Sequence, residues 1–225
     1  MTYRSFEELF KVASESWGVY KYEFKVCMTE IYNETVRDLL VKKGTDNSKH
    51  EIKQDEDGFT YVTDLTYQTV GGPKEFVEVM SIGSKNRSVG ATKMNDRSSR
   101  SHLVMAIIIE QTNTAKNTKK VSKLSLVDLA GSERLSKTEA EGERLKESLH
   151  INKSLSALGD VISALTSKKG HVPFRNSKLT HMLSDSLGND SKTLLFVNAS
   201  PVLYNAQESS CSLDFATRAR NVDLS

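Results

Sequence analysis

Three serines close together in the chain are the first residues that could do chemistry. Ser98, Ser99 and Ser101 lie in the polar segment Asn95–His102, which reads Asn-Asp-Arg-Ser-Ser-Arg-Ser-His. Small hydroxyls can reach phosphate oxygens, and they are the hard oxygen ligands that Mg²⁺ prefers. The segment therefore suits a sensor of a nucleotide phosphate.

A second polar segment, Asp128–Arg134, offers complementary groups and reads Asp-Leu-Ala-Gly-Ser-Glu-Arg. Asp128 ends an apolar run, the position from which a Walker-B type aspartate holds magnesium through water. Gly131 lets the backbone approach a γ-phosphate closely and swing when that phosphate leaves. Glu133 is acidic and Arg100 of the first segment is basic, so these two side chains could latch the segments together.

Two apolar runs position these segments. The run 103–109 follows the first segment and the run 121–127 leads into Asp128, with a polar turn over 111–120 between them. This order predicts two strands joined by a hairpin-like connection, so both polar segments should emerge near one edge of a sheet. In an open α/β sheet, phosphate ligands are held at that edge. Either segment alone leaves open a second interpretation, in which both are ordinary turns and Asp128 is a helix cap.

Helix and strand patterns alternate along the rest of the chain. Period-two alternation over 22–28 predicts a strand, and apolar residues three and four apart over 149–165 predict a long amphipathic helix. The other predicted elements are helices at 5–16, 73–86, 177–187 and 205–222, a helical turn from Asn33, a hairpin turn at 55–58 and a strand at 193–197. This alternation predicts a three-layer α/β fold in one domain, residues 1–225.

Composition narrows the class of protein. A chain of 225 residues can bury a substantial core, and a formal net charge of +2 means that any surface for an acidic partner is a local patch. Cys27 and Cys211 lie far apart in apolar-patterned segments, which favours free thiols over a disulfide. No apolar run approaches the roughly 20 residues that span a bilayer, and acidic residues near Met1 argue against a secretory signal. We expect a cytoplasmic protein.

The two polar segments also resemble a known family. Asn95–His102 resembles switch I of the kinesin motor head, and Asp128–Glu133 resembles its switch II. The resemblance continues through four further motifs, at Ile31–Leu40, Ile151–Gly159, Val172–Thr180 and Phe215–Ala219. It therefore covers nearly the whole chain and implies a three-layer kinesin-type P-loop NTPase fold.

The resemblance implies ATP and Mg²⁺ as cofactors and assigns roles to the two segments. The residues implied to bind nucleotide are Asn95, Ser98, Ser99, Asp128 and Gly131, of which Ser99 and Asp128 would hold the metal. The residues implied to act in hydrolysis are Ser98, Arg100, Gly131 and Glu133. In this family such loops order around the γ-phosphate and change the angle of the following helix on the microtubule.

One feature of the family is absent from the sequence. The kinesin head begins with a phosphate loop of the form G-x-x-x-x-G-K-[ST], and no Gly-Lys-Ser or Gly-Lys-Thr occurs in this chain. The chain resembles the last two-thirds of a head, so we expect an incomplete fold that lacks the central strand and exposes unpaired backbone. Since the loop would supply the amide cradle and lysine, we also expect no ATPase activity from this polypeptide alone.

The resemblance implies that the region after switch II binds the surface of tubulin, which is acidic. The basic residues expected there are Lys137, Lys153, Arg175 and Lys178. Each alone could belong to an ordinary solvated face, and a run of glutamates over 139–147 would oppose docking. The chain also ends soon after its last predicted helix, which is similar to minus-end-directed kinesins with a C-terminal motor.

Two functional interpretations stay open. The first is a microtubule motor domain, a cytoskeletal protein, of which this chain is the C-terminal two-thirds. The second is a protein that binds microtubules or another kinesin chain without hydrolysing ATP. A nucleic-acid binder is disfavoured because the sequence has no helix-turn-helix signature and no platform of aromatic and basic residues.

Overall fold

The computed structural model describes residues 2–41, 49–89, 97–131, 143–167, 170–188 and 191–222. The chain packs into two compact units. The first comprises residues 1–31, 36–50 and 64–129, and the second comprises residues 32–35, 51–63 and 130–225.

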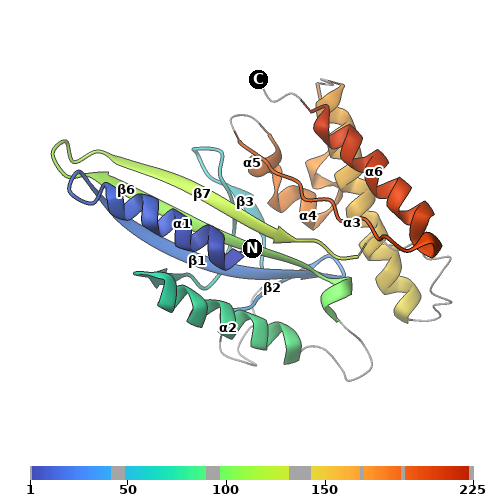
Figure 1. Cartoon of the computed structure of the whole chain (residues 1–225), viewed down its shortest axis with the longest axis horizontal. Helices are drawn as coiled ribbons and strands as arrows, with labels where there is room; N and C mark the ends of the chain where they lie inside the picture. Colours follow the sequence, from blue (N-terminus) through green and yellow to red (C-terminus); the bar gives the residue numbers. More distant parts are fainter. Residues whose placement is uncertain are drawn as a thin grey trace. The chain divides into compact units, whose positions relative to one another are not determined.

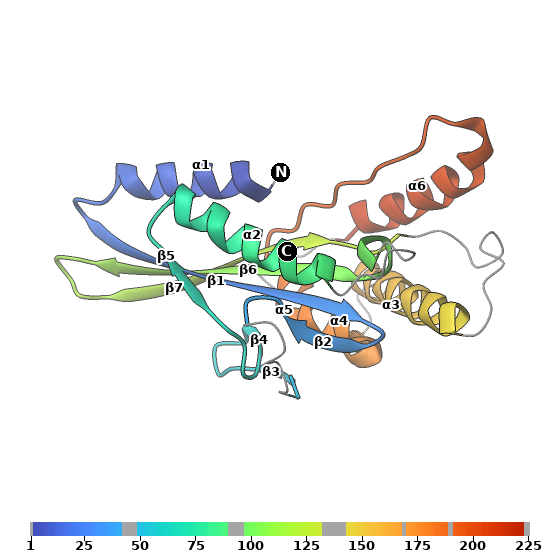
Figure 2. The ribbon, with the colours of Figure 1, turned by 90° about the horizontal axis from the view of Figure 1, so that it is seen from below.

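The first unit is built on a sheet with the strand order β2–β1–β6–β7 (Figure 1). Strand β5, labelled in Figure 2, also pairs with β1. The strands are β1 Tyr20–Tyr32, β2 Thr35–Asp38, β5 Gln68–Val70, β6 His102–Asn113 and β7 Lys119–Asp128. β6 and β7 are antiparallel, with Leu103 opposite Asp128 and Thr112 opposite Lys119, and form the long ribbon of Figure 2. The predicted hairpin is therefore confirmed, and Asp128 lies beside the start of β6.

Two helices, α1 Thr2–Glu15 and α2 Pro73–Val89, pack against this sheet through an aromatic cluster. The rings of Phe6 and Phe76 stack with centroids 4.0 Å apart and planes 2° apart, and Phe24 of β1 meets Phe6 edge-on at 5.8 Å. All three side chains are buried. Burial of each such side chain contributes about 1.5–3 kcal/mol, so this cluster fixes both helices on one face of the sheet.

The second unit is mainly helical, with α3 Glu143–Thr166 packed against α4 Lys178–Met182 and α6 Ala206–Arg220. Ala157, Leu158, Val161 and Ile162 form the buried stripe of α3, so the predicted amphipathic helix is confirmed. The remaining elements of this unit are β3 Ile52–Gln54, β4 Thr60–Val62, α5 Ser184–Leu187 and the 3-10 turns η3 Phe174–Asn176 and η4 Leu203–Asn205.

The helical turn predicted at Asn33 is wrong, because β1 turns there directly into β2. Asn33 and Glu34 have φ values of 53° and 56°, the left-handed geometry of a two-residue hairpin turn. Val36, Leu39 and Leu40 are buried as the pattern indicated. Their spacing of three and four residues fits a helix as well as it fits the observed hairpin. The sequence therefore predicted their burial correctly but gave the wrong secondary structure.

The strand predicted at 193–197 is also wrong. This run carries no ladder among the described residues, and Leu194 and Phe196 are 76% and 57% exposed. An apolar run becomes a strand only when a neighbouring strand takes its backbone hydrogen bonds. The helix predicted over 177–187 forms in two pieces, α4 and α5, which meet at Leu183.

β7 ends the sheet order on one side. Within the described part of the chain it pairs only with β6, and Val121 and Val127 are 47% and 38% exposed. This agrees with the expectation of unpaired backbone beside the switch-bearing strands. No helix among the described residues is long and apolar enough to cross a membrane.

Candidate functional site

The first polar segment ends in a short 3-10 turn, η1 Arg97–Arg100, that leads straight into β6. Ser101 and His102 at this junction are buried, whereas Ser99 is exposed and Arg100 is half-buried. The structure thus places Ser99 on the exposed side of this junction, next to the start of β6. Asn95 and the side chain of Ser98 lie outside the described residues, so their roles stay predictions.

Asp128 ends β7 directly beside this junction. Its register partner on β6 is Leu103, and its side chain is 67% exposed. The structure therefore brings Asp128 and the serine segment to the same edge of the sheet, as the sequence predicted. Gly131 is half-buried and follows in the second unit, while Glu133 lies outside the described residues. The latch between Arg100 and Glu133 stays a prediction.

Arg87, which the sequence reasoning missed, joins the two segments. It lies in the last turn of α2, and its Nη1 donates to Asp128 Oδ2 at 3.2 Å. Its Nη2 donates to the carbonyl oxygen and the Oγ of Ser101, at 3.0 and 3.3 Å. A guanidinium has five donors in a planar fork, so one side chain can hold both strand ends at once. The one available signal was a basic residue next to the end of the helix predicted at 73–86.

The pKa of His102 depends on the charged groups at this edge of the sheet. Burial lowers the pKa of its imidazole to about 4; the positive charge of Arg87 also lowers it, while Asp128 opposes the shift. The ring is therefore neutral at pH 7 and can donate from one nitrogen only. The positive charge at this edge therefore lies on arginines, Arg87 and Arg100 among the described side chains, and not on His102.

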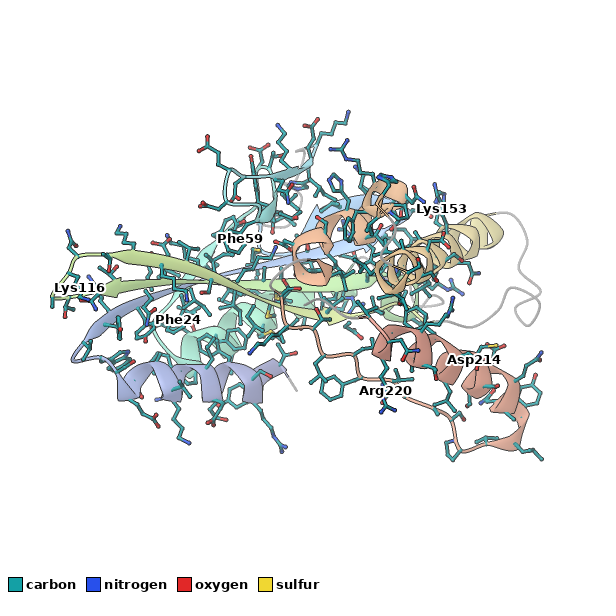
Figure 3. All side chains as sticks on the ribbon, turned by 90° about the horizontal axis from the view of Figure 1, so that it is seen from above. Phe24, Phe59, Lys116, Lys153, Asp214 and Arg220 are labelled. Atoms are coloured by element: carbon teal, nitrogen blue, oxygen red, sulfur yellow. The ribbon has the colours of Figure 1, made fainter. Side chains whose placement is uncertain are left out.

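In the second unit, three of the four predicted track-binding residues lie on elements that touch one another. Lys153 is exposed on α3 (Figure 3), Arg175 is exposed in η3, and Lys178 begins α4. η3 packs against both α3 and α4. Lys137 lies outside the described residues.

His181 shows that positive charges converge at the start of α4. Its pKa is lowered by burial and further by the charges of Arg175 and Lys178. The helix start itself is fixed by a capping box, in which Ser177 Oγ accepts from the Thr180 amide at 3.1 Å. The Lys178 amide also donates to Glu34 Oε2 at 3.0 Å. Hydrogen bonds therefore fix the backbone at the start of α4, beside the basic cluster of Arg175 and Lys178, while the lowered pKa leaves His181 mostly neutral at pH 7.

The β3–β4 hairpin was not predicted to lie beside this basic cluster. The Thr60 amide donates to Asp185 Oδ2 at 2.8 Å, and the hydroxyls of Thr60 and Ser184 are 2.8 Å apart. The predicted turn at 55–58 is confirmed, with Gly58 at a φ of 85°. Contacts between residues so far apart in the chain leave no local sequence signal.

Comparison with known proteins agrees with the motifs. A family profile described as the kinesin motor domain matches residues 1–222. The kinesin-like protein KIN-14R of Arabidopsis thaliana is 50% identical over 224 residues, a match that covers all of this chain and 21% of the relative. The chain thus spans about a fifth of that protein's length.

Two solved structures share the fold. A fast kinesin is 42% identical with a TM-score of 0.89, and the match covers 99% of this chain and 62% of the other. The C-terminal motor and motor homology domain of Kar3Vik1 is 39% identical with a TM-score of 0.85, covering 96% and 56%. The predicted α/β kinesin-type fold and the likeness to C-terminal-motor kinesins are confirmed. The chain belongs to the kinesin motor domain family.

Proposed function

We propose that this chain is the nucleotide-sensing and track-binding part of a microtubule motor domain. The observation that carries the proposal is the contact of Arg87 with both Asp128 and Ser101, which ties the two switch-like segments to one helix. A movement of either segment would then displace the other through Arg87. Such coupled loops are how nucleotide switches transmit the presence of a γ-phosphate.

The donor groups at this edge fit Mg²⁺ and ATP. Ser99 is an exposed residue with a hydroxyl group and Asp128 has a largely exposed carboxylate, and both groups are hard oxygen ligands. When bound, magnesium would neutralise the charge of the phosphates. Ser99 and Asp128 would hold the metal, Arg87 orients the Asp128 carboxylate, and Arg100 would meet Glu133.

We expect binding without turnover from this polypeptide alone. Its sequence contains no G-x-x-x-x-G-K-[ST] loop to supply the amide cradle and the lysine. Loss of one preorganised donor costs about 2.7–4 kcal/mol in a transition state, so loss of a whole cradle should abolish hydrolysis.

The basic cluster of Arg175 and Lys178, together with Lys153, would dock on the acidic surface of tubulin. Its positive charge is local, since the chain as a whole carries only +2. Electrostatic docking of this kind weakens as salt rises. The protein would then associate with the microtubule cytoskeleton.

A second function, binding microtubules or another kinesin chain without any nucleotide step, is favoured by one observation. The stretch 194–204 exposes Leu194, Phe196, Leu203 and Tyr204. Large apolar side chains with this much exposed surface can be covered by a partner protein.

Two measurements on the purified chain separate these functions. A fluorescent, non-hydrolysable ATP analogue should bind in the presence of Mg²⁺, and Asp128→Asn should weaken that binding whereas Glu110→Gln, far along β6, should not. Co-sedimentation with microtubules should fall for the double variant Arg175→Glu/Lys178→Glu. Microtubule binding without any magnesium-dependent nucleotide binding would leave only the second function.

A further inference from the structure

A carboxylate lies fully buried next to the site just described. Glu30 is on β1, and its side chain has no exposed surface. Across the sheet Glu30 pairs with Leu103, and Leu103 pairs with Asp128. Residues paired across neighbouring strands point to the same face, so Glu30 and Asp128 both face the side on which α2 packs.

Two guanidiniums flank this carboxylate. Arg37 of β2 donates from Nη1 to Glu30 Oε2 at 2.9 Å, and Arg87 Nε lies 3.9 Å from Glu30 Oε1. With Asp128 included, the group holds two carboxylates and two guanidiniums, so its formal charge is zero. A buried charge is tolerated only when it is paired in this way.

The three nitrogens of Arg87 therefore face three different partners. Nε faces buried Glu30, whereas Nη1 and Nη2 reach Asp128 and Ser101 at the site. Arg87 is only 12% exposed and Asp128 is 67% exposed. Arg87 therefore bridges the fully buried carboxylate of Glu30 and the exposed carboxylate of Asp128 at the site.

We propose that Glu30, held by Arg37, is a positioning residue that orients Arg87 so that Arg87 keeps Asp128 and Ser101 together. This inference rests on the proposed function for its meaning in nucleotide sensing, although the arrangement can be tested without nucleotide. The role needs both the charge and the reach of glutamate. Without it, Arg87 would be drawn towards Asp128 and solvent, and its bonds to Ser101 would weaken.

The test follows the Arg87 Nε–H signal by ¹H–¹⁵N NMR in the whole chain, assigned through its loss in Arg87→Lys. We compare wild type with Glu30→Gln, Arg37→Met and Arg37→Lys. Glu110→Gln is the matched control, because Glu110 is also a sheet carboxylate in an ion pair, with Lys25 Nζ at 2.6 Å. Arg37→Met removes a half-exposed side chain and should fold even if Glu30→Gln does not.

Glu30→Gln removes the charge that faces Arg87 Nε at 3.9 Å, and Arg37→Met removes the charge-assisted hydrogen bond that holds Glu30 in place. Each should speed solvent exchange of the Arg87 Nε–H and of the Ser101 and His102 amides by about tenfold, the factor that corresponds to about 1.4 kcal/mol. Arg37→Lys should retain most of the protection, and Glu110→Gln all of it. The proposal is overturned if Arg37→Met leaves these rates at the wild-type value, or if Glu110→Gln speeds them equally.

A separate nucleotide measurement distinguishes failure of this inference from failure of the proposed function. If the fluorescent ATP analogue binds, Arg37→Met should weaken its binding by about tenfold, on the same reasoning. If wild type binds no nucleotide, the proposed function fails, while the exchange rates still decide whether Glu30 orients Arg87.

Discussion

Gly83 of α2 lies directly against the thioether of Met28 on β1. A Cβ added at Gly83 would stand 2.5 Å from Met28 Sδ and 2.6 Å from its Cε. Met28 is itself fully buried, so its end cannot simply move into solvent. Arg87 follows Gly83 by one helical turn and lies on the same face of α2. The close approach of α2 to the sheet at Gly83 therefore also sets the distance between Arg87 and the site.

Gly83→Ala should lower the free energy of unfolding by about 1 kcal/mol. Overpacking a core costs about 1–3 kcal/mol, which outweighs the gain of up to about 1 kcal/mol from replacing glycine in a helix. Urea unfolding followed by circular dichroism measures the change. Gly18→Ala is the control, since a Cβ there meets nothing within 4 Å. A Gly83→Ala variant more stable than wild type would show that Met28 repacks without cost.

Arg87→Met should raise the pKa of His102. The guanidinium lowers that pKa, and Asp128, which would remain, raises it. Titration of the His102 ring signals by NMR gives the value directly. Lys85→Met removes an exposed positive charge from the same helix and should leave the pKa of His102 where it is. An unchanged pKa in Arg87→Met would mean that the guanidinium is screened from the ring.

The buried state of His102 should make stability depend on pH. Its pKa in the folded chain is about 4, against 6.5 for an ordinary histidine, so between these values the unfolded chain binds more protons. This contribution is fully present above pH 6.5 and is lost as pH falls towards 4, up to about 3 kcal/mol. Urea unfolding at pH 4.5 and pH 7 measures it. His102→Asn should reduce the difference in the free energy of unfolding between the two pH values. If the variant and the wild type show the same pH dependence, groups other than His102 cause it.

Local pattern was enough to predict the parts of the site that lie at the ends of regular strands. Two apolar runs around a polar turn indicated β6 and β7, and this hairpin necessarily brings the start of one strand to the end of the other. Asp128 was therefore placed correctly from the sequence. The turn at 55–58 was predicted for the same reason, since glycine there adopts the positive φ that the turn requires.

What the sequence could not reveal depends on partners distant in the chain. Arg87 meets Asp128, 41 residues away, through the packing of α2 on the sheet, and no spacing rule covers such a contact. The run 193–197 has the composition of a strand, but a ladder needs a neighbour that the described chain does not offer. At Asn33, burial at Val36, Leu39 and Leu40 suited a helix or a hairpin equally, and the left-handed backbone decided for the hairpin.

Ser177→Ala should loosen the start of α4 and, with it, the basic cluster. The Ser177 hydroxyl accepts from the Thr180 amide, and an alanine there leaves that amide buried without a partner. Loss of such a cap costs about 0.5–2 kcal/mol, which is large for a helix of one turn and a half. Since Arg175 and Lys178 stand on either side of Ser177, microtubule co-sedimentation should weaken together with the urea midpoint.

Ser212→Ala is the matched control for this prediction. The Ser212 hydroxyl donates to the Glu208 carbonyl within α6, which already takes part in a helical hydrogen bond, so its loss should cost little. If Ser177→Ala lowers the urea midpoint but leaves co-sedimentation unchanged, Arg175 and Lys178 do not need a fixed helix start to bind. Docking would then depend on their net charge, and its salt dependence should match that of a flexible basic peptide.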